Sequence, residues 1–65
     1  MNVDKLIDVM RENCYTLKMS YDGDVWEMAV YDEDLKLVTD RTIKDGALIK
    51  PKIAAAALSI VKELS

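Results

Sequence analysis

Two runs of alternating apolar and polar residues, joined by Asp22-Gly23, constrain the fold more than any other feature of this sequence. Strict alternation is typical of β-strands with one buried face. The dipeptide Asp-Gly is preferred in tight type I′ hairpin turns, because both central residues of such a turn need a positive φ. The apolar positions of the two runs are Tyr15, Leu17, Met19, Tyr21, Trp26, Met28 and Val30. The sequence therefore predicts an antiparallel hairpin with one apolar face.

The register of this hairpin follows from the position of the turn. If Asp22-Gly23 forms a two-residue loop, Tyr21 lies opposite Asp24. The predicted apolar pairs are then Met19–Trp26, Leu17–Met28 and Tyr15–Val30. On the other face Lys18 lies opposite Glu27, and such an opposite-charge pair contributes roughly 0.2–1 kcal/mol. A slip by one residue would move the whole apolar set to the other face.

A helix is predicted on each side of the strands. Residues 3–12 carry apolar side chains at helical spacing, with Asn2 as the N-cap and Asn13 as a left-handed C-cap. Pro51 suits the first turn of a second helix, since its missing N–H is not needed there. The apolar stripe of the second helix comprises Ile53, Ala54, Ala57, Leu58, Ile60, Val61 and Leu64. Its polar side comprises Lys52, Ala55, Ala56, Ser59, Lys62 and Glu63.

A third strand is predicted over Leu35–Thr42, after the polar turn at residues 32–34. Pairing Val30 with Leu37 would place Trp26 opposite Arg41, where a cation–π contact can form, and Glu27 near Asp40. The predicted fold class is α+β: helix, three-stranded antiparallel meander, helix (αβββα). Both helices cover the apolar face of the sheet, and residues 1–65 form a single domain.

The residue types present argue against an enzyme and against a metal or cofactor site. The composition, 51% hydrophobic and 32% charged, is that of a folded chain. The sequence has no histidine, so it lacks the most common general base and metal ligand. Cys14 follows a helix C-terminus, which does not activate a thiol, and we expect it to be half-buried. A chain of 65 residues has little room for a substrate cavity beside its core, so no small-molecule substrate is expected.

Charge and hydropathy suggest a cytoplasmic protein with a protein partner. The formal net charge of −3 disfavours direct nucleic-acid binding, although Lys44, Lys50 and Lys52 form a small basic cluster that leaves this alternative open. The first residues do not resemble a secretory signal. The longest apolar run, residues 53–58, is much shorter than the ~20 residues that span a membrane. No membrane association is expected.

The outer face of the predicted sheet is more apolar than a solvated face requires. We expect it to contact a host protein or a second copy of the chain, with Tyr31 as the anchor and the acidic turns at either end of the sheet taking part. The candidate partner-binding residues are Val25, Ala29, Tyr31, Val38, Asp22, Asp24, Asp32, Glu33 and Asp34. A structural protein that self-associates is a further alternative, since a three-stranded sheet leaves two free edges.

The opening of the chain resembles small acidic proteins of bacteriophages and other mobile elements. An Asn-capped helix with Leu6 and Ile7 runs into Tyr15-Thr16-Leu17-Lys18-Met19-Ser20, and this stretch is similar to the start of some anti-CRISPR inhibitors of type II CRISPR nucleases. The resemblance covers about the first twenty residues. It implies an inhibitor that imitates DNA charge, with Asp22, Asp24, Asp32, Glu33 and Asp34 in place of phosphates. The apolar helix at residues 51–65 and the low net charge depart from that pattern.

Overall fold

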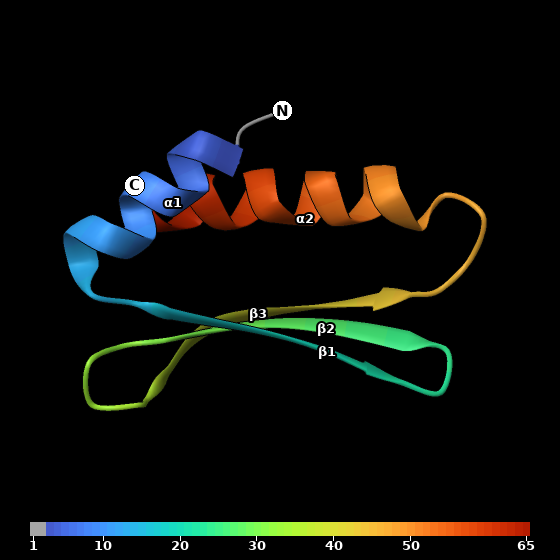
Figure 1. Ribbon diagram of the computed structural model, residues 1–65, viewed down its shortest axis with the longest axis horizontal. Helices are drawn as coiled ribbons and strands as arrows, with labels where there is room; N and C mark the ends of the chain where they lie inside the picture. Colours follow the sequence, from blue (N-terminus) through green and yellow to red (C-terminus); the bar gives the residue numbers. More distant parts are fainter. Residues whose placement is uncertain (1–2) are drawn as a thin grey trace.

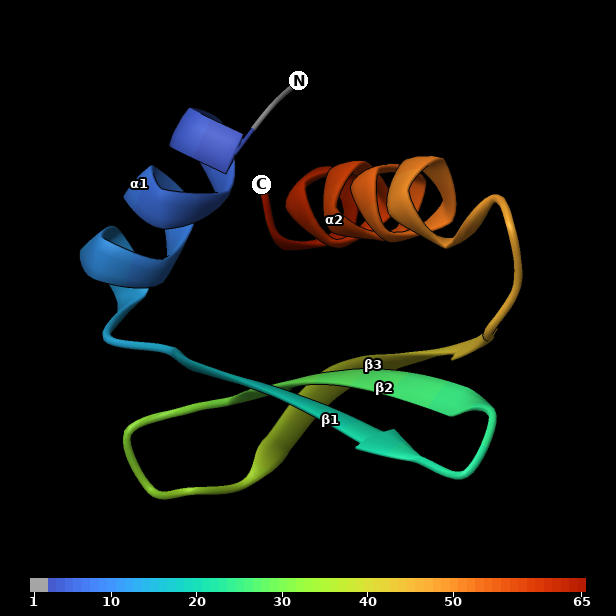
Figure 2. The ribbon, with the colours of Figure 1, turned by 45° about the vertical axis from the view of Figure 1, so that its right-hand side comes forward.

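A sheet of three antiparallel strands forms one layer of the protein, and two helices form the other (Figure 1). The computed structural model describes residues 3–65. Its elements are α1 (Val3–Asn13), β1 (Thr16–Asp22), β2 (Val25–Tyr31), β3 (Leu37–Lys44) and α2 (Ile49–Leu64). The strand order is β1-β2-β3, and both helices lie on the same face of the sheet (Figure 2). The predicted αβββα fold is confirmed.

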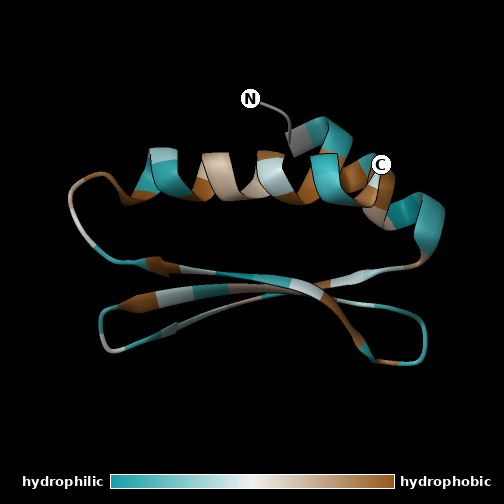
Figure 3. Ribbon diagram, turned by 180° about the vertical axis from the view of Figure 1, so that it is seen from behind, coloured by the Kyte–Doolittle hydropathy of each residue, from teal (hydrophilic) through white to brown (hydrophobic). Residues whose placement is uncertain are grey.

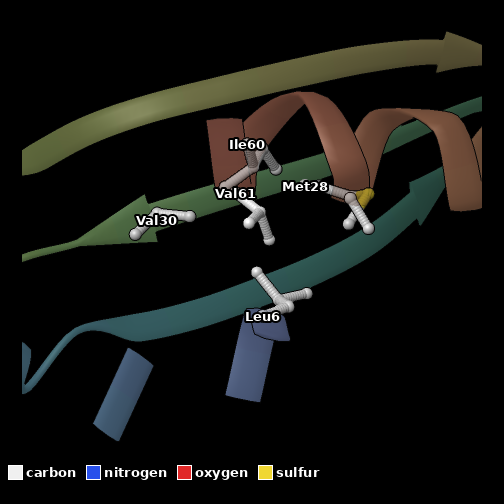
Figure 4. Close-up of a cluster of buried hydrophobic side chains, with 6 residues drawn as sticks. Leu6, Met28, Val30, Ile60 and Val61 are labelled. Atoms are coloured by element: carbon white, nitrogen blue, oxygen red, sulfur yellow. The ribbon is translucent and has the colours of Figure 1, made fainter. Parts of the chain in front are cut away.

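The core lies between β2 and α2, with α1 closing one side. Val30 and Ile60 are fully buried at 0% exposure. Figure 4 shows side chains from β2, α2 and α1 converging on one another. The buried cluster consists of Leu6, Met28, Val30, Ala57, Ile60 and Val61. Ala56 also packs against this cluster, so its predicted place on the polar side of α2 is wrong.

The end of α1 is a Schellman motif, in which two backbone N–H groups bond back to the last turn. The Tyr15 N–H donates to the Met10 carbonyl at 3.0 Å, and the Cys14 N–H donates to that of Arg11 at 3.5 Å. The left-handed residue is Cys14, with φ 55°, so the prediction of Asn13 in this role is wrong. Asn13 stays helical, and its side-chain amide donates to the Val9 carbonyl at 2.9 Å.

Two further expectations concern the same helix. Cys14 is exposed and not half-buried, because the left-handed turn directs the chain away from α1 at that residue. The predicted N-cap, Asn2, lies outside the described residues.

The β1–β2 hairpin turns one residue later than predicted. Asp22 pairs with Val25, which leaves Gly23 and Asp24 as the two-residue loop. Gly23 has φ 70° and is the only residue of this loop with a positive φ. A type II′ turn needs a positive φ only at its first central position, whereas type I′ needs two, and this difference sets the position of the loop.

The later turn moves every β1–β2 pairing by two residues and keeps the same faces. The observed pairs include Leu17–Val30, Lys18–Ala29, Met19–Met28, Ser20–Glu27 and Tyr21–Trp26. The predicted pairing of Lys18 with Glu27 is therefore wrong. Trp26 is half-buried; its ring lies 4.8 Å from that of Tyr21, and its indole N–H donates to Asp45 Oδ1 at 3.1 Å.

The register of β3 also differs from the prediction. Val30 pairs with Thr39 and not with Leu37, and Met28 pairs with Arg41. A β-bulge between Val30 and Tyr31 and a longer loop before β3 account for this offset. The predicted Trp26–Arg41 contact is wrong, since Ile43 lies opposite Trp26. Glu27 faces Thr42, and Asp40 faces Ala29, so the two acids are not paired either.

Arg41 connects β3 to α2. Its guanidinium donates to Ser59 Oγ at 3.1 Å and forms an ion pair with Glu63 Oε1 at 2.7 Å. The hydrogen bond from Arg41, with the Thr39 hydroxyl as a second contributor, lowers the pKa of Glu63 from its ordinary value. Ser59 and Glu63 therefore face β3, although the sequence placed them on the solvent side of α2. Pro51 lies in the first turn of α2, as predicted.

Candidate protein-binding surface

The predicted partner-binding residues lie on the outer face of the sheet and at its two ends. Val25, Ala29 and Tyr31 alternate along β2 with residues that face the helices. Asp22 is the last residue of β1, and Asp24 lies within the β1–β2 turn. The other three acids lie in the β2–β3 loop at the opposite end, so the structure separates the two acidic groups: Asp32, Glu33 and Asp34 lie at one end, and Asp22 and Asp24 at the other.

The middle of the outer face is polar and offers no large apolar anchor. Ala29 is only 3% exposed and lies between Lys18 and Asp40 on the neighbouring strands. Val25 is half-buried between Asp22 and Lys44 in the same way. These two small side chains bury little apolar surface against a partner, so they can contribute only to the shape of an interface.

One end of the outer face is distinctly apolar. Tyr31 pairs with Leu37 across the end of the sheet, next to Val38 and the loop residue Leu35. Leu35 is 74% exposed and Leu37 55% exposed. Figure 3 shows hydrophobic segments in the β2–β3 loop and at the start of β3. We call this surface the Leu35 patch: it consists of Tyr31, Leu35, Leu37 and Val38.

The sequence predicted two of the four patch residues, Tyr31 and Val38, but not the two leucines. It placed Leu35 and Leu37 inside a regular strand, where they would face the helices. Lys36 separates the two leucines, and this alternation of apolar and polar residues is the same pattern that predicts a strand. The signal that could have revealed them is the acidic turn before Leu35, since such a turn leaves the following residues in a loop.

Leu35 has an unusual backbone conformation for a large side chain, with φ 62°. Positive φ favours glycine and, among other residues, Asn and Asp. Asp32 holds the loop in this shape: its Oδ1 accepts the N–H groups of Asp34 and Lys36, each at 2.9 Å. The Leu35 N–H donates to the Asp32 carbonyl at 3.0 Å. The Asp32 carboxylate thus stabilises the loop through these hydrogen bonds, whereas the side chains of Glu33 and Asp34 are exposed to solvent.

A shallow hollow of about 380 Å³ lies beside the Leu35 patch. Leu35 and Tyr31 form one wall, and Thr16, Leu17 and Lys18 of β1 form the other. The hollow is open to solvent, so it suits a side chain presented by another macromolecule better than an enclosed small ligand.

Other features of the described chain are less suited to recognition. A second open hollow, of about 540 Å³, lies between the helices over Val9, Leu58 and Val61. The lysines of the nucleic-acid alternative lie on two elements: Lys44 ends β3, and Lys50 and Lys52 belong to the first turns of α2. Within residues 3–65, no three Cys, Asp or Glu side chains are grouped so as to hold a metal ion. Neither helix of this part of the chain is long and apolar enough to cross a bilayer.

No protein-family model matches the chain, and no significant match was found among curated proteins or solved structures.

Proposed function

We propose that this protein is a non-enzymatic protein-binding module that regulates or inhibits a host protein through the Leu35 patch. The observation that carries the proposal is Leu35 itself. A left-handed backbone costs a non-glycine residue roughly 1–2 kcal/mol, and exposure to water gains nothing for an apolar side chain. Leucine at this position therefore lowers stability without contributing to the core. Unfavourable local conformations of this kind are found at functional sites.

The charge around the patch indicates the chemistry of the partner. Glu33 and Asp34 border the patch, and both are exposed. A complementary surface would hold an apolar groove with Lys or Arg at its rim, because opposite charges around an apolar contact favour the correct encounter. Tyr31 is half-buried and can anchor the contact with its ring.

An origin in a bacteriophage or another mobile element, and an anti-CRISPR-like role, belong to the same proposal. Their support is the N-terminal resemblance together with the exposed acids, Asp22, Asp24, Glu33 and Asp34. The four acids lie at opposite ends of the sheet. A DNA-mimicking contact would have to use one end at a time or extend along the whole sheet.

The test uses two exposed leucines as a matched pair. Leu35→Asn removes the most exposed apolar side chain of the patch, and asparagine suits a positive φ. Leu48→Asn, at the other end of the molecule, changes a leucine that is 65% exposed and occupies the N-cap of α2 without a side-chain hydrogen bond. Asparagine is favourable at both positions, so both variants should fold at least as stably as the wild type.

Immobilised wild-type protein would first be used to isolate the partner from host lysate, and the dissociation constant of the purified pair would then be measured. We expect Leu35→Asn to weaken binding about tenfold or more and Leu48→Asn to change it less than about twofold. Equal affinity of the two variants, or the absence of any saturable protein partner, would overturn the proposal.

A further inference from the structure

β1 is an edge strand, paired with β2 on one side only. It runs through seven residues without proline or bulge, and every one of them is exposed. Because Asp22 and Val25 flank a two-residue loop, they exchange both backbone hydrogen bonds, and such pairs alternate along an antiparallel ladder. The N–H and C=O groups of the intervening residues, Leu17, Met19 and Tyr21, therefore point away from β2 toward solvent.

The side chains of the same three residues are also uncovered. They face the helix side of the sheet, like Met28 and Val30 opposite them. Leu17 is 38%, Met19 43% and Tyr21 49% exposed, because α1 packs mainly against α2 and does not cover β1. An exposed edge with an apolar stripe is a template for another strand.

We propose that β1 pairs with β1 of a second copy, antiparallel and centred on Met19. In this register Leu17 lies opposite Tyr21 of the other copy, and Met19 lies opposite itself. All three outward-facing residues of each strand then find partners within the other strand. A twofold arrangement keeps the apolar stripes of both copies on the same side of one continuous sheet.

The charges on the outer face select this register over its neighbours. Centring the pair on Lys18 would place two lysines directly opposite each other, which is unfavourable. Centring it on Ser20 would place Leu17 opposite Gly23, inside the turn. With Met19 at the centre, Lys18 faces Ser20, and its diagonal neighbours on the other copy are Asp22 on one side and Lys18 on the other, so the two lysines no longer lie directly opposite each other. The strand is therefore complementary to itself in its backbone groups, and this register avoids the direct opposition of two lysines.

The pairing also has a consequence for the outer face. Thr16, which pairs with Tyr31 in one chain, would lie opposite Asp22 of the other. Neighbouring strands are about 4.8 Å apart, so the acidic hairpin turn of one copy comes about 10 Å from Tyr31 of its mate. The dimer thus brings together the two acidic ends that a single chain keeps apart. The inference itself does not depend on the proposed function, since it rests on β1 and not on the Leu35 patch.

Sedimentation equilibrium between about 1 μM and 1 mM, a range that covers weak to moderate association, tests the pairing. We expect the average mass to rise from one chain to two. Met19→Lys, which sets two lysines opposite each other at the centre, should raise the dissociation constant about tenfold or more. Thr42→Lys adds the same charge on the other edge strand and should change it less than about twofold. Circular dichroism establishes that both variants fold.

Single cysteines in a Cys14→Ser background test the register. Opposed residues of a hydrogen-bonded antiparallel pair have Cα atoms about 5.5 Å apart, within the range of a disulfide. Met19→Cys should therefore cross-link to itself under mild oxidation. Lys18→Cys should not, because diagonal neighbours are about 7–8 Å apart. A chain that stays monomeric throughout, a dimer indifferent to Met19→Lys, or preferential cross-linking at position 18 would overturn the proposal.

Discussion

β1 and β2 are adjacent strands of equal length, and both present apolar residues to the helix side of the sheet, yet these residues differ in burial. On the helix side of β2, Met28 and Val30 are buried, whereas every residue of β1 is exposed, including those on the same side of the sheet. The difference arises because α2 lies over β2 and β3, whereas α1 packs against α2 and leaves β1 uncovered. Alternation thus identifies the apolar face of a strand, but only the helices above it decide whether that face is buried.

The largest effect should separate the two strands by stability. Ile60→Ala removes a fully buried side chain above β2, and such truncations cost about 2–5 kcal/mol. Met19→Ala truncates an exposed side chain of similar size on β1 and should cost less than about 1 kcal/mol in the monomer. Urea unfolding of dilute protein measures both. Equal losses of unfolding free energy would contradict the difference in burial between the strands.

A smaller effect concerns the junction between α1 and β1. Cys14 has a left-handed backbone conformation that costs an ordinary residue roughly 1–2 kcal/mol, whereas glycine adopts it freely. After the larger entropy loss of glycine on folding is subtracted, Cys14→Gly should raise the free energy of unfolding by about 0.5–1 kcal/mol. Cys14→Ser is the matched control and should leave stability nearly unchanged. A loss of stability in Cys14→Gly would show that the thiol contributes more than the strained backbone costs.

The smallest effect concerns the contact between β3 and α2. Arg41 lowers the pKa of Glu63, so the folded state binds this proton less readily than the unfolded state. The resulting stabilisation is fully present above the ordinary pKa of 4.5 and is lost as pH falls through the lower pKa of the folded state. Glu63→Gln should therefore lower the melting temperature slightly at neutral pH and make no difference in strong acid. A constant gap between variant and wild type at all pH values would exclude this linkage.

Local signals in the sequence predicted the order and type of the elements. Alternation marked β1 and β2, helical spacing marked α1 and α2, and Pro51 marked the first turn of α2. These signals depend on near neighbours in the chain, which is why they can be interpreted without a structure.

The strand registers could not be predicted in the same way. Both a turn at Asp22-Gly23 and one at Gly23-Asp24 use the same glycine, and they differ only in the turn type. The loop before β3 is held by hydrogen bonds to the Asp32 side chain. It includes Leu35 and Lys36, which the alternation in the sequence assigns to the strand. Both errors moved the partners by two residues, so the predicted faces of the hairpin stayed correct.

The candidate surface was predicted only in part. Tyr31 and Val38 follow from alternation, but the Leu35 patch also requires the loop conformation at Leu35. The exposure of β1 and the contact of Arg41 with α2 depend on how the helices pack across the sheet. Such contacts join residues far apart in the chain, and no local pattern encodes them.

Amide hydrogen exchange at two protein concentrations tests most directly the claim that β1 is open in the monomer and covered by a second copy. In dilute solution the amides of Leu17, Met19 and Tyr21 should exchange rapidly, while those of Met28 and Val30 exchange slowly. At concentrations where the dimer dominates, the three β1 amides should become protected. If the Met19 amide showed the same degree of protection at both protein concentrations, whether it was well protected or unprotected, the account would be contradicted.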